Sequence, residues 1–500
     1  MLGVDSVVSY GPCQFPTLGF VVERYLQRIV RTANWTDEKN FVPEPFWFIQ
    51  ATVKTLSSPS PSEGLIKLHW SRNRLFDELV TVTLYSLIAN ETDSTLKDMH
   101  EYFRDRTPTE KNQYTGMFQG KNLLLFTGEA FWIGAVNEQY TPTLYKLAHS
   151  GFVFENFYNP LWYYSTVDGE YAATTGLIPT NQVNASQRYA GKNGVSMYFS
   201  MGNQLRALGY PTLAYHNNTA NYYDRNLSHP NLGYDFYACD TGLDVAMTWP
   251  QSDLEMMQLT LPQALAGEKP FHNYYMTVSG HMNYSFAGNA MSAKHRDEVA
   301  DLDMSEAARA YLACNMELDQ ALEYTIKTLE EAGELENTVI VLSGDHYPYG
   351  LDGTGAIDEL AGEGTEADPF EKYRSTLILW SGDMEEPVVV DKPCYSVDII
   401  PTLSNLFGLE YDSRLLAGRD ILSDAPGLVI FNDYSYLTEL GRYNADTDTF
   451  TPNEGAQVPE NYAQDTYWEA RYIRSYSEKI LFNDYYRKIG LEPPAGPEEN

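Results

Sequence analysis

Two carboxylates and an imidazole stand directly after predicted strands, in positions that suit a bound cation. Asp345 and His346 follow the β-branched run 339–342, and Glu129 follows the apolar run 122–126. An adjacent acid and imidazole, joined by a distant carboxylate, can hold one divalent ion. An Asp-His pair can equally cap a turn. The buried strand before the pair, and the equivalent place of Glu129 on another strand, favour the cation site.

A candidate nucleophile stands before a predicted helix at 171–176, where Ser165 and Thr166 are followed by Asp168 and Glu170. Free backbone N–H groups at a helix start also bind phosphate oxygens. A hydroxyl there becomes a nucleophile when a base or a metal ion removes its proton. The same pattern satisfies ordinary capping rules, so both interpretations stay open from these residues alone.

Two further segments offer contacts for an anion. Arg225 closes a stretch rich in amides and aromatics that begins at His216. In so acidic a chain, such an arginine can clamp an anion bidentately, although a salt-bridged surface arginine is the alternative. His281 follows a β-prone run and could contact a phosphate oxygen or act as a general acid. A lone histidine is more often structural.

The composition limits the possible partners. The 500 residues carry a net charge of −34, which repels nucleic acid and disfavours it as a partner. An anionic substrate therefore needs a local positive site. The length predicts one large domain with an extension. We expect a lead-in segment at 1–118, a catalytic domain at 119–422 and a smaller α+β subdomain at 423–500.

Strands and helices alternate along the chain, which predicts an α/β fold with a central, mostly parallel sheet flanked by helices. The clearest unit is a helix at 305–333 with one apolar face, followed by the strand at 339–342. In such sheets the active site lies beyond the carboxyl ends of the strands. Further helices are expected at 20–30, 95–104, 141–150 and 395–406, and further strands at 122–126, 152–157, 273–278 and 375–380.

Four widely spaced cysteines, at positions 13, 239, 314 and 394, exclude a zinc knuckle of the C-x-x-C type. They permit disulfides, but buried thiols are the simpler expectation. The sequence contains no apolar run of the ~18 residues that span a bilayer, and it begins with no signal peptide. Taken at face value these features predict a soluble chain, and they fit a soluble portion of a longer membrane protein equally well.

The order of these residues resembles the alkaline phosphatase and sulfatase superfamily, and more narrowly the lipoteichoic acid synthase family of Gram-positive bacteria. The similarity runs from about 121 to 422. It rests on five elements in the correct order: Thr-Pro-Thr-Leu at 141–144 with Phe-x-Asn-Phe-Tyr at 154–158, Ser-Thr-x-Asp-x-Glu at 165–170, Ser-Gly-His at 279–281, Ser-Gly-Asp-His-x-Pro-Tyr-Gly at 343–350, and Asp-Ile-Ile-Pro-Thr at 398–402.

The resemblance implies a role for each candidate residue. One divalent ion, Mn²⁺ or otherwise Mg²⁺ or Zn²⁺, would be held by Glu129, Thr166, Asp345 and His346. Thr166 would be the nucleophile that becomes phosphoglycerylated. The substrate site would be lined by His216, Asn218, Tyr223, Arg225 and His281. The family normally has an acid and a tryptophan where this chain has Asn218 and Tyr223.

The implied activity is transfer of glycerol phosphate from a phosphatidylglycerol-type lipid to a glycolipid or polyol hydroxyl. It would take place at the extracellular face of a Gram-positive cell membrane, either on a membrane segment absent from this chain or as a released ectodomain. The segment 1–118 would be the stalk. A phosphoethanolamine transferase or phosphodiesterase on the same scaffold is the first alternative. A degenerate module that binds cell-wall polymer is the second.

Two branches of the superfamily fit poorly. The sulfatase branch proper needs a Cys or Ser in C/S-x-P-x-R, a motif absent from this sequence. The three-metal alkaline phosphatases need additional Asp and His ligands, and this chain has nine histidines, most of them assigned elsewhere.

Overall fold

The computed structural model describes residues 47–54, 63–70, 84 and 87–494. It divides into two compact units, Met1–Leu75 and Phe76–Asn500. The first unit contains an antiparallel ribbon of β1 (Trp47–Lys54) and β2 (Glu63–Trp70). The helix predicted at 20–30 lies outside the described residues. Across the described ranges, every helix is too short or too polar to cross a bilayer.

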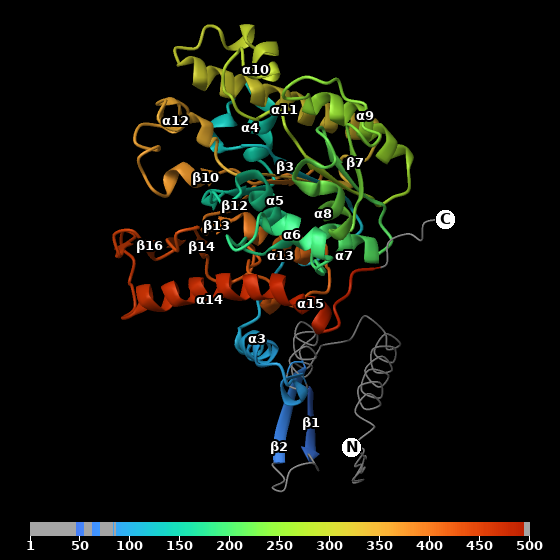
Figure 1. Cartoon of the computed structure of the whole chain (residues 1–500), viewed down its shortest axis with the longest axis vertical. Helices are drawn as coiled ribbons and strands as arrows, with labels where there is room; N and C mark the ends of the chain where they lie inside the picture. Colours follow the sequence, from blue (N-terminus) through green and yellow to red (C-terminus); the bar gives the residue numbers. More distant parts are fainter. Residues whose placement is uncertain (1–46, 55–62, 71–83, 85–86, 495–500) are drawn as a thin grey trace. The chain divides into compact units, whose positions relative to one another are not determined.

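The larger unit is built on an eight-stranded sheet in the order β12-β4-β11-β9-β3-β8-β6-β7. Strands β3, β7 and β12 of this sheet are labelled in Figure 1. The pairings around β3, β6 and β8 are parallel, whereas β11 runs antiparallel to both of its neighbours. The predicted mostly parallel sheet is confirmed. The strands are β3 (Asn122–Gly128), β4 (Phe152–Phe154), β6 (Thr212–His216), β7 (Asp235–Ala238), β8 (His272–Met276), β9 (Thr338–Gly344), β11 (Ile378–Ser381) and β12 (Val388–Val390).

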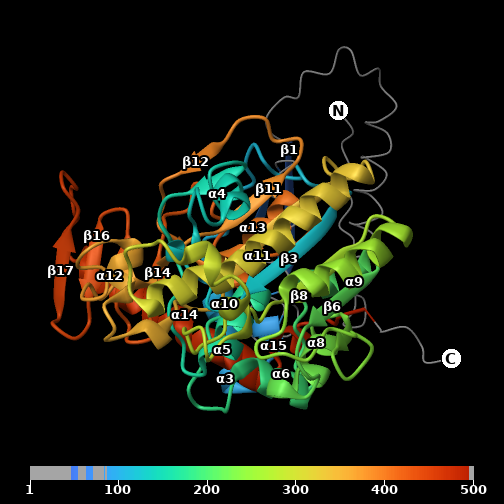
Figure 2. The same ribbon diagram turned by 90° about the horizontal axis from the view of Figure 1, so that it is seen from above.

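Helices cover both faces of the sheet, and alternate side chains of the central strands face each layer. Ile340 and Leu342 of β9 join a core with α4, α9 and α11, and Figure 2 shows α9 and α11 side by side. Val339 and Val341 join the core with α5, α7 and α13. The helices are α3 (Ser94–Asp105), α4 (Pro142–Ala148), α5 (Ser165–Thr175), α6 (Ser186–Asn193), α7 (Met201–Ala207), α8 (Arg225–Asn231), α9 (Asp253–Ala266), α10 (Ala290–Lys294), α11 (Glu306–Glu331), α12 (Ala356–Ala361) and α13 (Ile399–Leu406).

Several predicted elements differ from the structure in their boundaries. The strand predicted at 152–157 divides into β4 and β5 (Phe157–Tyr158), and the strand predicted at 375–380 divides into β10 (Arg374–Ser375) and β11. Each divides because its two halves belong to different sheets: β5 pairs with β10 and with β13 (Cys394–Tyr395). The segment 395–406, which was predicted as one helix, instead contains the end of β13, a short 3₁₀ turn and α13.

The end of the chain forms the predicted α+β region. A four-stranded antiparallel sheet precedes α14, which contributes Ala470, Ile473 and Ile480 to the main core. The elements are β14 (Val429–Ile430), β15 (Tyr436–Thr438), β16 (Gly441–Asn444), β17 (Thr449–Pro452), α14 (Tyr462–Asn483) and α15 (Tyr485–Lys488). The three cysteines in the described part of the chain, Cys239, Cys314 and Cys394, are free thiols.

Candidate active site

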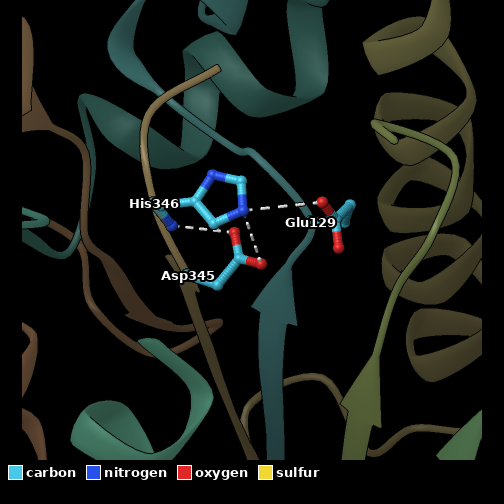
Figure 3. A group of neighbouring side chains, drawn as sticks. All are labelled: Glu129, Asp345 and His346. Carbon is cyan, nitrogen blue, oxygen red and sulfur yellow. Dashed lines mark hydrogen bonds and ion pairs between the residues drawn. The ribbon is translucent and has the colours of Figure 1, made fainter. Parts of the chain in front are cut away.

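The predicted cation ligands meet at the carboxyl ends of two neighbouring parallel strands. Gly128 at the end of β3 is paired with Gly344 at the end of β9, so the residues that follow them are brought together. The side chains of Glu129, Asp345 and His346 point toward one another (Figure 3). All three are buried, and one ligand atom from each lies within 4.8 Å of the others.

The hydrogen bonds of this cluster leave its inner atoms available to a ligand. Asp345 Oδ1 accepts from the backbone N–H groups of Ala130 (2.7 Å) and His346 (2.8 Å). Its other oxygen, Oδ2, is buried and has no hydrogen-bond partner. His346 Nδ1–H donates to the carbonyl of Tyr347 (2.8 Å), so the Nε2 lone pair faces Asp345 Oδ2 at 3.5 Å and Glu129 Oε1 at 3.7 Å. An orphaned carboxylate oxygen beside an oriented imidazole fits a metal ion.

The electrostatics of the cluster also favour a bound cation, because two buried carboxylates lie close together. Burial raises the pKa of Asp345 to about 8. Burial, with the nearby charge of Asp345, raises the pKa of Glu129 to about 7. His346 Nε2 lies 3.5 Å from Asp345 Oδ2 and 3.7 Å from Glu129 Oε1, but burial lowers the pKa of His346, so this ring is neutral and supplies no charge. A divalent ion would remove the repulsion between the two ionised carboxylates. Two carboxylates and an imidazole suit Mn²⁺, Mg²⁺ or Zn²⁺.

The hydroxyl of Thr166 lies in the same cluster. Its Oγ1 is 3.4 Å from Glu129 Oε2 and 3.3 Å from His346 Nε2. Thr166 is in the first turn of α5, which begins at Ser165 and not at the predicted position 171. Ser165 has a φ of +35°, a conformation that side chains other than glycine adopt only under strain. This turn points the hydroxyl of the next residue at the cluster, so the four predicted metal-site residues converge.

Arg225 lies at the centre of a buried polar network. The guanidinium is fully buried, and its Nε and Nη2 lie 3.1 and 3.0 Å from Glu170 Oε2. Its Nη1 lies 3.1 Å from His216 Nε2. His216 Nδ1–H donates to the Met276 carbonyl (3.0 Å), so the Nε2 lone pair accepts from the arginine. Because burial and Arg225 hold the pKa of His216 well below its usual range, this histidine is neutral. His216 thus positions Arg225.

Glu170 connects this network to α5 and the sheet. Its Oε1 accepts from the Tyr274 hydroxyl (3.0 Å) and lies 3.3 Å from His229 Nε2. Burial acts to raise the pKa of Glu170, but Arg225 and His229 outweigh it and hold that pKa well below the usual range. Sequence reasoning missed His229 and Tyr274. The four-residue spacing of Arg225 and His229 on α8 was an available signal, because it places both on one helix face.

The remaining predicted contacts lie in loops around the cluster. His281 is partly buried, its Nδ1–H donates to the Met282 carbonyl (2.6 Å), and its ring lies 4.8 Å from that of Trp249. The Tyr223 ring lies 5.4 Å from the Arg225 guanidinium. Asn218 Oδ1 accepts from the neighbouring Thr219 N–H (2.7 Å), so this side chain shapes its own turn.

Asp253 joins two of these loops and was not identified from the sequence. This buried residue begins α9 and accepts from Val278 N–H (2.9 Å), from the Ser279 N–H and hydroxyl, and from Asn217 Nδ2 (2.8 Å). Burial raises the pKa of Asp253 to about 6. Its partners follow β6 and β8, so one carboxylate fixes both the loop that follows His216 and the loop that carries His281. At position 253 the sequence shows only the usual acidic first turn of a helix.

Two known proteins are similar in sequence to most of this chain. The lipoteichoic acid synthase-like protein YvgJ of Bacillus subtilis is 23% identical over 442 residues, which cover 85% of this chain and 69% of that protein. Lipoteichoic acid synthase 2 of Bacillus subtilis is 24% identical over 436 residues, which cover 83% of this chain and 64% of that protein. The chain thus spans about two thirds of the length of these relatives.

A solved structure and a family model extend the comparison. The crystal structure of the lipoteichoic acid synthase LtaP from Listeria monocytogenes aligns with a TM-score of 0.65 and 22% identity, over 78% of this chain and 98% of that one. It has the same fold, which confirms the predicted alkaline phosphatase and sulfatase-like architecture. The model of the sulfatase family matches residues 121–409, more than half of the chain and all four residues of the cluster. The chain belongs to the sulfatase family.

Proposed function

We propose that this chain is a metal-dependent phosphoglycerol transferase of the lipoteichoic acid synthase type. The observation that carries the proposal is the position of the Thr166 hydroxyl, 3.3 Å from His346 Nε2 and 3.4 Å from Glu129 Oε2. Both atoms belong to a buried cluster of two carboxylates and one neutral imidazole. The names of the similar proteins support the choice of transferred group. At Thr166 the sequence has no C/S-x-P-x-R motif, which disfavours sulfate-ester hydrolysis.

The bound metal would be held by Glu129, Asp345, His346 and the Thr166 hydroxyl. When bound, a divalent ion of this kind lowers the pKa of a coordinated hydroxyl and offsets negative charge on a phosphate. We propose Mn²⁺, with Mg²⁺ and Zn²⁺ as the other ions that suit these ligands.

The reaction has two steps at one phosphorus atom. In the first, Thr166 Oγ1 bonds to the phosphorus of phosphatidylglycerol and the bond to the diacylglycerol oxygen breaks. Thr166 loses its proton, the departing oxygen gains one, and His281 is the proposed proton carrier. In the second, a glycolipid or polyol hydroxyl bonds to the same phosphorus and the Thr166 Oγ1–phosphorus bond breaks. The acceptor hydroxyl loses its proton and Thr166 regains one.

Arg225 would supply positive charge to the phosphate, held in place by Glu170 and His216. Tyr223 and Asn218, at the same loop, would contact the glycerol or the acceptor. We propose that the protein acts at the extracellular face of a Gram-positive cell membrane and that residues 1–118 serve as the stalk.

Mass spectrometry of the intact protein tests the proposal. The chain is incubated with phosphatidylglycerol and Mn²⁺, without acceptor, and the adduct is mapped by proteolysis. We expect a glycerophosphoryl group on Thr166, no adduct in Thr166→Ala, and a reduced yield in Thr166→Ser. Full turnover by Thr166→Ala would exclude the covalent route. Parallel incubation with phosphatidylethanolamine distinguishes the phosphoethanolamine transferase, because its adduct has a different mass.

A further inference from the structure

Two consecutive residues before Arg225 have an unusual backbone conformation. Tyr223 has a φ of +58° and Asp224 a φ of +54°, in the left-handed region that residues with a side chain rarely adopt. Two such residues in a row, one of them a bulky tyrosine, need support from the surrounding structure. Backbone strain of this kind clusters where it places functional groups, and Arg225 begins α8 directly after it.

The Asp224 side chain is bound to a neighbouring helix. Asp224 stands at the N-cap of α8, where an aspartate normally accepts from backbone N–H groups of its own helix. In α8, which the structure describes in full, it makes no such bond. Its Oδ2 instead pairs with Arg188 Nε and with Lys192 Nζ (3.0 Å). These two residues are four positions apart and therefore lie on one face of α6. The carboxylate thus ties the left-handed turn to α6.

The start of α6 is anchored to the turn that carries the proposed nucleophile. Ser186 N–H donates to Asp168 Oδ1 (3.0 Å), and the other oxygen of this buried carboxylate accepts from Tyr164 N–H (3.1 Å). Tyr164 directly precedes the first turn of α5, which contains Thr166. One carboxylate therefore holds the first residue of α6 and the entry to α5 together.

The same helix also lies against α8. Gln187 Nε2 donates to Ser228 Oγ of α8 (3.4 Å), and both residues are buried. Figures 1 and 2 show α6 next to both α5 and α8. The partners of Asp224 thus stand on an element that is fixed to the helix that carries Thr166 and to the helix that begins with Arg225.

The left-handed turn determines how Tyr223 is placed at the site. Its ring lies 5.4 Å from the Arg225 guanidinium, a distance that suits a cation–π contact. Burial raises the pKa of the Tyr223 hydroxyl, Tyr222 adds to this shift, and so does the charge of Glu129. The hydroxyl is therefore within electrostatic reach of the cation cluster. A change in the turn would move this ring relative to both the guanidinium and the cluster.

We propose that Asp224 is a positioning residue for anion binding, and that it acts through its ion pairs with Arg188 and Lys192. These pairs hold the turn that fixes the Tyr223 ring against Arg225. The inference rests on the proposed function, because Arg225 is the proposed contact of the substrate phosphate and Tyr223 that of the glycerol or the acceptor.

Calorimetric titration with glycerol phosphate tests the inference without turnover. The whole chain is loaded with Mn²⁺, and the Kd for glycerol phosphate is measured in the parent and in Asp224→Asn. Asparagine also enters the left-handed region and has a similar volume, but it carries no charge. We expect Asp224→Asn to bind glycerol phosphate about fivefold more weakly, which is the scale of partly exposed ion pairs. Its Kd for Mn²⁺ should equal that of the parent, since the proposed metal ligands lie outside the turn.

The direction of the change separates positioning from simple electrostatics. Asp224→Asn removes a negative charge near an anion site, and the loss of that repulsion alone would tighten the binding of glycerol phosphate. Weaker binding therefore requires that the turn has moved. Binding as tight as in the parent, or tighter, overturns the proposal.

Substitution of the partners on α6 tests the same pairs from the other side. Arg188→Met with Lys192→Met should also weaken the binding of glycerol phosphate, although Asp224 is unchanged. The triple variant with Asp224→Asn should bind no more weakly than this double variant, because the same ion pairs are lost in both. Losses that multiply in the triple variant would contradict the proposed route through α6.

Asp235→Asn is the matched control. Asp235 also forms an ion pair at the surface, with Arg206 (2.9 Å), but it begins β7, whereas His216 is paired with Ala238 at the other end of that strand. This variant should bind glycerol phosphate as the parent does. Thermal unfolding midpoints show that each variant is folded at the temperature of the titration. A lower midpoint with an unchanged Kd would reduce Asp224 to a structural residue.

Mass spectrometry of Thr166 separates this inference from the proposed function. Weaker anion binding by Asp224→Asn, in a chain whose parent forms no adduct with phosphatidylglycerol, would leave the positioning role standing and overturn the transferase. An adduct on the parent, with equal binding of glycerol phosphate by Asp224→Asn, would do the reverse. A parent that binds no glycerol phosphate overturns the anion site and this inference with it.

Discussion

Gly169 of α5 lies directly against the main chain of Asp345. A Cβ on Gly169 would stand 2.0 Å from the Asp345 carbonyl oxygen, and a Cβ on Gly280 would stand 2.2 Å from the Glu129 carbonyl oxygen. Real side chains do not tolerate such distances from a backbone atom. The two glycines therefore allow close packing at the predicted metal ligands Glu129, Asp345 and His346. Gly169 lets the helix that carries Thr166 approach them, and Gly280 does the same for the loop after β8.

We predict that Gly169→Ala weakens both the fold and the metal site. The added methyl must displace the Asp345 backbone, and overpacking of this kind destabilises proteins by about 1–3 kcal/mol. The free energy of unfolding, from urea titrations with and without Mn²⁺, measures both effects. Gly267→Ala is the matched control, since its Cβ would lie 3.5 Å from the nearest atoms and its φ is −86°. Equal stability of the two variants would contradict the close approach.

A second prediction concerns Glu129 as a metal ligand. Mn²⁺ at a hundredfold excess over its Kd should stabilise the parent chain by about 2.7 kcal/mol. In Glu129→Gln most of this gain should vanish, because the variant lacks one of the two ligand carboxylates. Without metal, Gln should be tolerated, since it removes a buried acid without changing the volume.

Thermal unfolding at several Mn²⁺ concentrations measures this difference. Glu155→Gln is the control, because Glu155 is an exposed carboxylate at the end of β4. It should keep the full metal-dependent rise in Tm. A rise in Glu129→Gln as large as in the parent would remove Glu129 from the metal site.

The parts of the fold that could be predicted from the sequence are those with strong local patterns. The strand β9 contains the apolar run 339–342, and α11 repeats apolar residues at helical spacing from its Ser305 cap. The start of α5 was placed six residues too late, because Thr166, Val167 and Gly169 favour helix poorly. Tertiary contacts of the buried α5 hold that turn.

The convergence of the site residues could be predicted most directly where they follow strands. Glu129, Asp345 and His346 come directly after β3 and β9, so parallel pairing brings them together. Asp253 lies 25 residues from Val278 in the sequence, and its spacing gives no sign of their hydrogen bond. Partners of that kind depend on how α9 packs over the sheet.

A third prediction concerns the buried pair of Glu170 and Arg225. Glu170→Gln would leave the buried arginine without its charge partner, and breaking such a pair typically costs about 3–5 kcal/mol. Urea unfolding measures the loss. The double variant Glu170→Gln with Arg225→Met should recover much of it, because the unpaired charge is then gone. A single variant as stable as the parent would show that the pair is dispensable.

The fourth prediction uses the raised pKa of Asp253, which is about 6 in the folded chain against a usual 3.8. Between these values the folded state holds more protons than the unfolded state, so this group lowers stability as pH rises from about 4 to 6 and then has no further effect. The contribution is on the order of 3 kcal/mol. Asp253→Asn should make the fall in unfolding free energy over that window shallower.

Urea unfolding at pH 4, 5, 6 and 7 would measure this slope, with Asp319→Asn as the matched variant. Asp319 is also buried, with a pKa raised to about 6, but it accepts from Leu144 N–H and lies on α11. Both variants should flatten the slope. Only Asp253→Asn should also raise the KM for the proposed lipid donor, because Asp253 fixes the loop after His216 through Asn217 and the loop that carries His281 through Ser279. An unchanged KM would reduce Asp253 to a purely structural residue, whereas an unchanged slope would mean that its carboxyl is not perturbed by burial.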